Sequence, residues 1–327
     1  MEGTFEFLGL TVYPFGLFVT MAALVMLVLM GVLGMKRRLP EGTVRVFGVI
    51  AVPMGVLFAR LVYCLMNLPF FIGTYENPGL MLRFFDGGFS MTGLLLGLVL
   101  AVLIAAKIMK APLSDLFDVF AVGLAAFLAL VYFGHQYTEL GVGKVVESNW
   151  LTENLPFLFI ARRMGRVEYR LAVYLYQAIF CLILLAVSLC LFLGKKQRRS
   201  GNVALSFFTL LGAGEILLES LRDDGHMLLI FLRVGQLGAV IMILVCLIVI
   251  TRRYAKEKKG GAAVLLTWLA FLACVAAGVL MEFALDGRMV TGDLTKLHLY
   301  GILALICIAS AALPLGLLRG LKTVDPE

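Results

Sequence analysis

Residues 114–135 read SDLFDVFAVGLAAFLALVYFGH, and no charged residue stands between Asp118 and the histidine that ends the run. A helix that crosses a bilayer needs about 20 mostly apolar residues, because the hydrocarbon is about 30 Å thick and a helix rises about 1.5 Å per residue. The stretch therefore predicts a membrane-spanning helix, with Asp118 near one end and His135 near the other.

Comparable apolar runs recur along the whole chain. They are continuous and lack the period-2 alternation of barrel strands, so each is expected to be a helix. The fold class predicted is an all-α, polytopic helical bundle in the membrane. The nine spans are expected at 10–35, 46–68, 88–106, 114–135, 171–194, 202–221, 227–251, 261–283 and 297–318.

The composition agrees with this interpretation. Of 327 residues, 61% are hydrophobic and only 15% are charged, whereas soluble domains are about 45–50% apolar and about 25% charged. A water-soluble enzyme, a disordered chain and a disulfide-framed chain are thereby excluded. The six cysteines lie in apolar runs without metal-ligand or redox spacing, so they are expected to pack as small side chains. No metal site and no cofactor are predicted.

The net charge of +7 is explained by topology, because the basic residues gather in alternate links between the spans. Cytoplasmic loops carry an excess of Lys and Arg, so these links and the C-terminus are expected inside and the N-terminus outside. The basic runs are short and carry no nucleic-acid-reading motif, so nucleic acid is not an expected partner. No cleaved signal peptide is expected, because the first span is long and lacks a basic segment before it.

The chain divides into a seven-span membrane domain, 1–251, a basic linker, 252–261, and an appended transmembrane hairpin with a short tail, 262–327. The link 136–170 is long for an outer loop and mixes five basic residues with four glutamates and several aromatics. Two interpretations stay open for this polar loop. It can attract a negatively charged headgroup or substrate, or it can simply be a soluble loop of mixed charge.

A few polar side chains interrupt the spans near their predicted outer ends. Each ionisable group at membrane depth costs about 2.5–3.5 kcal/mol on insertion scales, so such groups are candidates for function. Arginine suits a phosphate headgroup because its guanidinium binds phosphate in a bidentate fork. Structural roles stay open as well, since Glu219 and Arg222 can neutralise each other and Arg60 can extend to the interface. The polar residues are Arg60, His135, Glu215, Glu219, Arg222, Arg233 and Gln236, with Glu282 and His298 expected at the interface.

Several ordered blocks of the first 251 residues resemble one family of bacterial enzymes, the prolipoprotein diacylglyceryl transferases. The stretch Phe85-Asp86-Gly87-Gly88-Phe89-Ser90 is similar to the family's aromatic-Asp-Gly-Gly-x-Ser and is the most specific of them. The other blocks are Phe15-Gly16-Leu17, Arg60 with Tyr63, Asp115-Leu116 with Asp118, Gly212-Ala213 with Glu219 and Arg222, and Gly235-Gln236. The resemblance covers about 8–251 and leaves the last two spans outside it.

The resemblance implies a seven-helix enzyme of the bacterial plasma membrane that moves a diacylglyceryl group from phosphatidylglycerol to the thiol of a lipobox cysteine. A cationic site would hold the phosphate, a base would assist the thiol, and glycerol phosphate would leave. The implied partners are an anionic phospholipid and a prolipoprotein or another membrane protein. The residues assigned to the headgroup are Arg60, Asp86, Gly87, Gly88, Glu219, Arg233 and Gln236, and those assigned to catalysis are His135, Glu139 and Arg222.

The chain departs from the family pattern at three places. Thr92 stands where the family has the histidine of His-Gly-Gly, and Val131 replaces the arginine of Gly-Arg-x-Gly-Asn if Glu139 takes the family glutamate. The block 171–177 lacks the family's His-Pro as well. His135, one turn beyond Val131, is a candidate replacement base. Three functions follow: an active transferase, a non-catalytic relative that binds phospholipid as a partner subunit, and a transporter, which the lack of a repeat or broken-helix pair disfavours.

Overall fold

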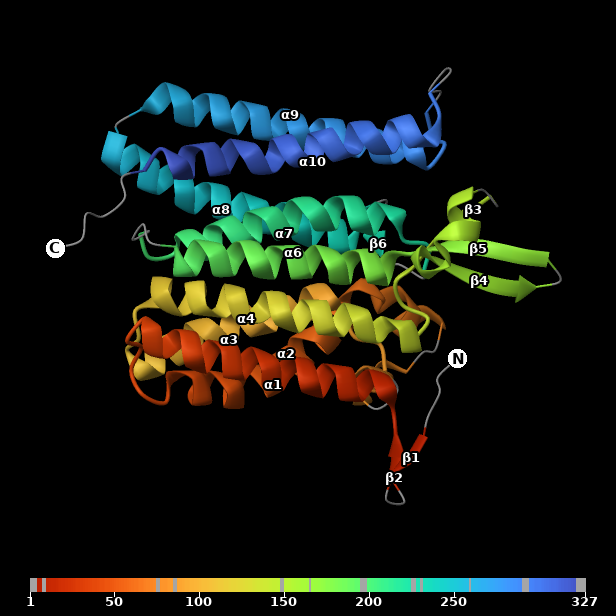
Figure 1. Ribbon diagram of the computed structural model, residues 1–327, viewed down its shortest axis with the longest axis horizontal. Coiled ribbons are helices and arrows are strands. Elements are labelled where there is room, and N and C mark those ends of the chain that lie inside the picture. Colours follow the sequence, from red (N-terminus) through yellow and green to blue (C-terminus); the bar gives the residue numbers. More distant parts are fainter. Residues whose placement is uncertain are drawn as a thin grey trace.

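The computed structural model is dominated by long helices that run side by side (Figure 1). It describes residues 5–7, 10–74, 77–84, 87–147, 150–164, 166–194, 199–224, 228–229, 232–258, 260–289 and 294–321. Among these residues, nine helices are long and apolar enough to cross a membrane, which confirms the predicted fold class. They are α1 (Pro14–Lys36), α2 (Thr43–Met66), α3 (Met91–Met109), α4 (Leu113–Gly134), α6 (Val173–Leu193), α7 (Asn202–Leu221), α8 (Val234–Lys258), α9 (Gly261–Leu285) and α10 (Lys296–Arg319).

Helix α4 lies at the centre of the bundle and is buried along most of its length. It packs against α1, α6 and α7, while α2 pairs with α3 and α7 with α8. Small residues permit this central position, because they let neighbouring helices approach closely. In a bilayer such close packing stabilises helix association, since no hydrophobic driving force acts between the helices. A side chain at Gly123, for example, would place its Cβ 2.8 Å from Met30 of α1.

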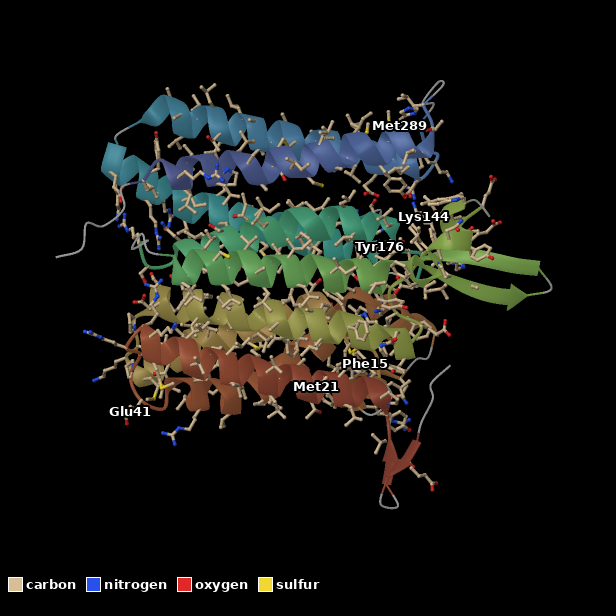
Figure 2. The ribbon with its side chains drawn as sticks, in the orientation of Figure 1. Phe15, Met21, Glu41, Lys144, Tyr176 and Met289 are labelled. Atoms are coloured by element: carbon tan, nitrogen blue, oxygen red, sulfur yellow. The ribbon has the colours of Figure 1, made fainter. Side chains whose placement is uncertain are left out.

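A three-stranded antiparallel sheet projects from one end of the bundle, which we call the sheet end (Figure 1). It contains β3 (Val142–Val146), β4 (Phe159–Met164) and β5 (Arg166–Ala172) in the order β3-β5-β4, with the short helix α5 (Trp150–Asn154) between β3 and β4. The long polar link 136–170 is thus a folded module. The connections that carry most of the basic residues lie at the opposite end, where Figure 2 marks Glu41.

Short strands delay the start of two predicted spans, the first and the seventh. Residues Leu10–Val12 form β2, paired with β1 (Phe5–Phe7), so α1 begins only at Pro14. The start of the seventh span at residue 227 is also wrong. Strands β6 (Leu228–Leu229) and β7 (Leu232–Arg233) pair with each other, and α8 begins at Val234. Arg233 therefore precedes the helix, and only Gln236 lies in its first turn.

The last two helices form a hairpin that packs on α7 and α8, as Figure 1 shows in blue. An apolar cluster joins them, with Ile243 and Leu247 of α8 against Phe271 of α9 and Leu299 and Leu303 of α10. These five side chains are almost completely buried. The hairpin is therefore joined to α7 and α8 by an apolar contact surface that comes mainly from α10.

Candidate functional site

Arg60 of α2 is buried and binds the backbone of the segment that leads to α3. Its Nε donates to the carbonyl of Met81 at 3.0 Å, and Nη2 donates to that of Leu80 at 2.9 Å. Nη1 donates to the carbonyls of Gly87 and Gly88. The guanidinium has five N–H donors, so four protein acceptors use most of its capacity. Arg60 thus fixes the loop before α3.

The two glycines of this loop have a backbone that other residues rarely adopt. Gly87 and Gly88 have φ of +74° and +75°. A Cβ on Gly88 would lie 2.5 Å from the ring of Tyr63 and 2.9 Å from Nη1 of Arg60. Glycine is therefore required where the chain turns against the arginine. Asp86, assigned to the headgroup from the sequence, lies outside the described residues.

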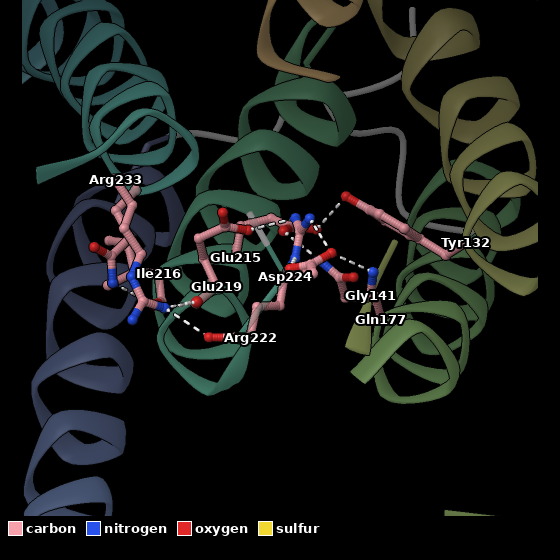
Figure 3. A network of polar contacts seen from close by, with 10 residues as sticks. Tyr132, Gly141, Gln177, Glu215, Ile216, Glu219, Arg222, Asp224 and Arg233 are labelled. Atoms are coloured by element: carbon pink, nitrogen blue, oxygen red, sulfur yellow. Dashed lines mark hydrogen bonds and ion pairs between the residues drawn. The ribbon is translucent and has the colours of Figure 1, made fainter. Parts of the chain in front are cut away.

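A carboxylate network occupies the middle of the bundle towards the sheet end (Figure 3). Glu215 of α7 is buried and accepts a hydrogen bond from the hydroxyl of Tyr132 of α4 at 2.8 Å. Its other oxygen accepts from the amide of Gln177 of α6 at 3.1 Å. Oε1 of Gln177 is buried and has no hydrogen-bond partner among the described residues. Side chains of α4, α6 and α7 thus meet at the carboxylate of Glu215. The side-chain oxygen of Gln177 lies next to it and has no donor among the described residues.

Arg222 follows α7 and joins two carboxylates. Its Nη1 donates to Glu219 at 2.8 Å, while Nε and Nη2 form a bidentate fork on Asp224 at 2.9 and 2.8 Å. Asp224 also accepts from the amide of Gly141, just before β3. Burial alone would lower the pKa of Arg222, but Glu219 and Asp224 raise it above its ordinary value. The guanidinium therefore stays charged and fixes the end of α7 to the sheet.

Arg233 of β7 and Gln236 of α8 bind the last turns of α7. Nη1 of Arg233 donates to the carbonyls of Glu219 and Arg222, which lie among the last carbonyls of the helix. The side-chain amide of Gln236 donates to the carbonyl of Ile216 at 3.3 Å and to Oε1 of Glu282 at 2.7 Å. Glu282 belongs to α9, so this hydrogen bond joins α8 to the hairpin.

His135 lies at the C-terminus of α4 with its imidazole buried. Its ring centroid is 5.7 Å from that of Tyr132 and 5.3 Å from that of Phe15. Nδ1 has no hydrogen-bond partner among the residues that the structure describes. Arg222 and Asp224 are the charged groups that act on the ring. Glu139, in contrast, is exposed in the link before β3.

The two positions that depart from the family pattern both lie inside the bundle. Thr92 is in the first turn of α3, and a Cβ on Gly238 of α8 would meet its Cγ2 at 2.6 Å. Val131 is almost completely buried in the central apolar cluster, one turn before His135. Both side chains are therefore part of helix packing.

The structure adds four residues that the sequence did not assign to the site: Tyr132, Gln177, Asp224 and Glu282. Gln177 gives a recognisable signal, since an amide in an apolar span is costly unless it is bonded. Asp224 adjoins Arg222 in the sequence. Nothing local identifies Tyr132, because a tyrosine near the end of a span is common at membrane interfaces.

Comparison with known proteins supports the resemblance of the sequence motifs. The sequence profile described as Prolipoprotein diacylglyceryl transferase matches residues 2–252. The chain belongs to the prolipoprotein diacylglyceryl transferase family. Together with the nine candidate spans, membership places it in the bacterial inner membrane as a multi-pass protein.

Curated members of the prolipoprotein diacylglyceryl transferase family are distant relatives. The phosphatidylglycerol--prolipoprotein diacylglyceryl transferase of Bacillus licheniformis is 25% identical over 256 residues, which are 78% of this chain and 93% of the relative. The enzyme of that name from Pediococcus pentosaceus is 24% identical over 76% of this chain and 90% of its own length. That from Lysinibacillus sphaericus is 26% identical over 68% and 81%. The family profile ends before α9, so the hairpin lies outside the matched segment.

Proposed function

We propose that the chain transfers the diacylglyceryl group of phosphatidylglycerol to a thiol of a prolipoprotein at the sheet end. Family membership and the names of its relatives support this activity. The observation that carries the proposal is the buried imidazole of His135. Its Nδ1 has no described partner, and its ring lies beside that of Tyr132, whose hydroxyl donates to Glu215. An imidazole nitrogen that borders a polar network, and receives no hydrogen bond from it, is suited to take a proton.

The reaction needs one bond to form and one to break. The acceptor thiol gives its proton to Nδ1 of His135, and the sulfur attacks the carbon that joins the diacylglyceryl group to phosphate. The S–C bond forms as the C–O bond breaks, and glycerol phosphate leaves with the electron pair. Arg222 stays charged beside this site and favours the anion that departs.

Other residues that the sequence assigns to the site fix the backbone and side chains around it. Arg60, Gly87 and Gly88 shape the loop before α3, Glu219 aligns Arg222, and Arg233 binds the end of α7. We propose that the exposed Glu139 lies where the acceptor peptide approaches. If the basic links are cytoplasmic, as the positive-inside rule indicates, the sheet end faces the outer leaflet.

A second candidate function is phospholipid binding without transfer, in a membrane partner subunit. One observation favours it. Thr92 and Val131 provide neither the base nor the cation of the family pattern, so the chemical step has lost two of its expected groups while lipid contact needs neither.

The two functions are separated by a transfer assay. Purified protein in nanodiscs that contain phosphatidylglycerol is mixed with a lipobox peptide, and released glycerol phosphate is measured. We expect release by the wild type and a fall of about 100-fold or more in His135→Ala, since a general base contributes roughly 10²–10⁴-fold. Gln136→Ala, a change at the exposed neighbour, is the matched control and should keep full activity. Equal rates in His135→Ala and wild type would remove His135 from the mechanism, and lipid binding without release would favour the second function.

A further inference from the structure

The appended hairpin contributes a carboxylate to the group of polar residues at the end of α7. Glu282, in the last turn of α9, accepts a hydrogen bond of 2.7 Å from the side-chain amide of Gln236. Gln236 belongs to the matched family segment, while Glu282 lies about thirty residues beyond its end at residue 252. The contact therefore joins a family residue to a part of this chain that the family profile does not include.

This contact determines which way the amide of Gln236 points. A side-chain amide has two donors on nitrogen and two acceptor positions on oxygen, and the two ends differ little in shape. The neighbours of Gln236 Nε2 are the carbonyl of Ile216 and the carboxylate of Glu282, and a carbonyl and a carboxylate only accept. The nitrogen must therefore face α7 and α9. The oxygen lies in the same plane on the other edge of the amide, away from these two acceptors, where it can accept from a ligand.

Other contacts hold this end of the hairpin against α7 and the sheet. The hydroxyl of Tyr300 in α10 donates to the carbonyl of Ser220 at 3.4 Å, and Nζ of Lys144 in β3 lies 5.6 Å from the centroid of the Tyr300 ring. Figure 2 shows Lys144 between the sheet and the hairpin. Leu285, one turn after Glu282, is buried in the apolar cluster that joins the hairpin to α8. The backbone that carries Glu282 is thus packed against the first seven long helices.

Two nearby cations favour the ionised form of Glu282, while its burial opposes it. Arg233 and Lys144 are these cations, and Asp286 is the acidic neighbour one turn later. An ionised acceptor forms a hydrogen bond roughly twice as strong as a neutral one, so an ionised Glu282 orients the amide better than a glutamine would.

We propose that Glu282 is a positioning residue that holds the Gln236 amide with its oxygen towards the site, where it accepts a hydroxyl of the glycerol headgroup. The hairpin then forms a fixed wall of that site. This inference rests on the proposed function, since it takes the headgroup of phosphatidylglycerol as the ligand. It predicts that the hairpin acts on lipid binding more than on the chemical step.

The test compares full-length variants in the transfer assay, with phosphatidylglycerol varied and the peptide saturating. In Glu282→Gln and Glu282→Ala we expect KM for phosphatidylglycerol to rise about tenfold and kcat to stay within about twofold, the pattern of a lost binding contact. Asp286→Asn is the matched control. It removes an exposed acid from the same end of the hairpin, and both constants should stay unchanged.

A swapped pair separates positioning from simple docking. In the double variant Gln236→Glu with Glu282→Gln, the amide and the carboxylate exchange places and the hydrogen bond can form again. The thermal midpoint should recover in part, because the bond between positions 236 and 282 returns while the donation to the carbonyl of Ile216 is lost. KM should stay high because the acceptor at position 236 is now charged. Recovery of KM together with the midpoint would show that Glu282 only holds the hairpin, and would overturn the inference.

The remaining outcomes distinguish this inference from the proposed function. A wild type that turns over, with unchanged KM in both single variants at position 282, would overturn the inference and leave the function standing. A wild type that binds phosphatidylglycerol without release would exclude transfer, and the same variants would then be compared by Kd, with a rise of about tenfold expected. A wild type that does neither would overturn both.

Discussion

At the scale of single residues, the sheet end is an arrangement of charges that satisfy one another. Arg222 has contacts with two carboxylates, and its side chain is only 17% exposed. Arg170, in β5, pairs with Glu168 and Asp223, whose side chains are 37% and 47% exposed. The two arginines therefore provide a matched comparison of buried and accessible ion pairs.

Replacing Arg222 by alanine should be far more destabilising than replacing Arg170. Loss of one partner leaves the buried carboxylates of Glu219 and Asp224 uncompensated, which costs about 3–5 kcal/mol, whereas an accessible pair is worth about 0–1 kcal/mol. Unfolding of the purified variants in detergent, followed by circular dichroism, measures the difference. Equal stability of the two variants would mean that water or detergent reaches the Arg222 network freely.

The types of these residues were predictable from the sequence, but most of their partners were not. Glu219 and Arg222 are three residues apart at a helix end, so their pairing follows from helical geometry. Tyr132 and Glu215 are separated by 83 positions, and Gln236 and Glu282 by 46. Such contacts depend on how the helices pack, which hydropathy does not determine. Hydropathy assigns Arg60 to a headgroup site as a polar residue in a span. In the structure its guanidinium donates to the backbone of the loop before α3.

At the scale of secondary structure, α4 supplies the cap of α7 at the end opposite the sheet. Asp118 is fully buried and accepts from the amides of Gly201 and Ala204 at 2.8 and 2.9 Å, and Arg37 lies 3.5 Å from its carboxylate. Gly201 precedes α7 with φ of +89° and has no side chain that could cap the helix. The acid that resembled a family position is thus a cap supplied from another helix.

Asp118→Ala should therefore lower stability without acting on the sheet end. Loss of an N-terminal cap costs about 0.5–2 kcal/mol, and the two amides would be left in a buried place. Asp115→Ala is the control, since Asp115 is partly exposed, accepts from the hydroxyl of Ser200 and forms a 3.6 Å ion pair with Arg37, without capping a helix amide among the described residues. Thermal midpoints should fall more for Asp118→Ala. Equal midpoints would contradict the capping role.

The helical elements themselves were largely predictable, because a long apolar run has few alternatives in a bilayer. Errors arose at helix starts where short strands continue the apolar run. Leu228 and Leu229 look like the start of a span, yet they pair with Leu232 and Arg233 before α8 begins. A two-residue strand leaves no periodic pattern that a hydropathy window could detect.

At the scale of the whole molecule, the parity of the helices makes the orientation testable. Reporters fused after residues 258 and 321 follow seven and nine candidate spans, so both should report the same side of the membrane. A reporter fused after residue 287, between α9 and α10, should report the opposite side. By the positive-inside rule the first two are expected in the cytoplasm. Paired fusions to a cytoplasmic fluorophore and a periplasmic phosphatase measure this, and agreement of all three would contradict the hairpin.

The buried carboxylate of Glu215 also has a consequence for biogenesis. Chains are made from the N-terminus, and domains form as their segments emerge. Both partners of Glu215 precede it, Tyr132 in α4 and Gln177 in α6, so their donors are present in the membrane when α7 arrives. Glu219 brings its own counter-ion three residues later. The ribosome thus delivers each acid of α7 when a hydrogen-bond donor or a counter-ion is close by, and the translocon need not retain an unpaired carboxylate.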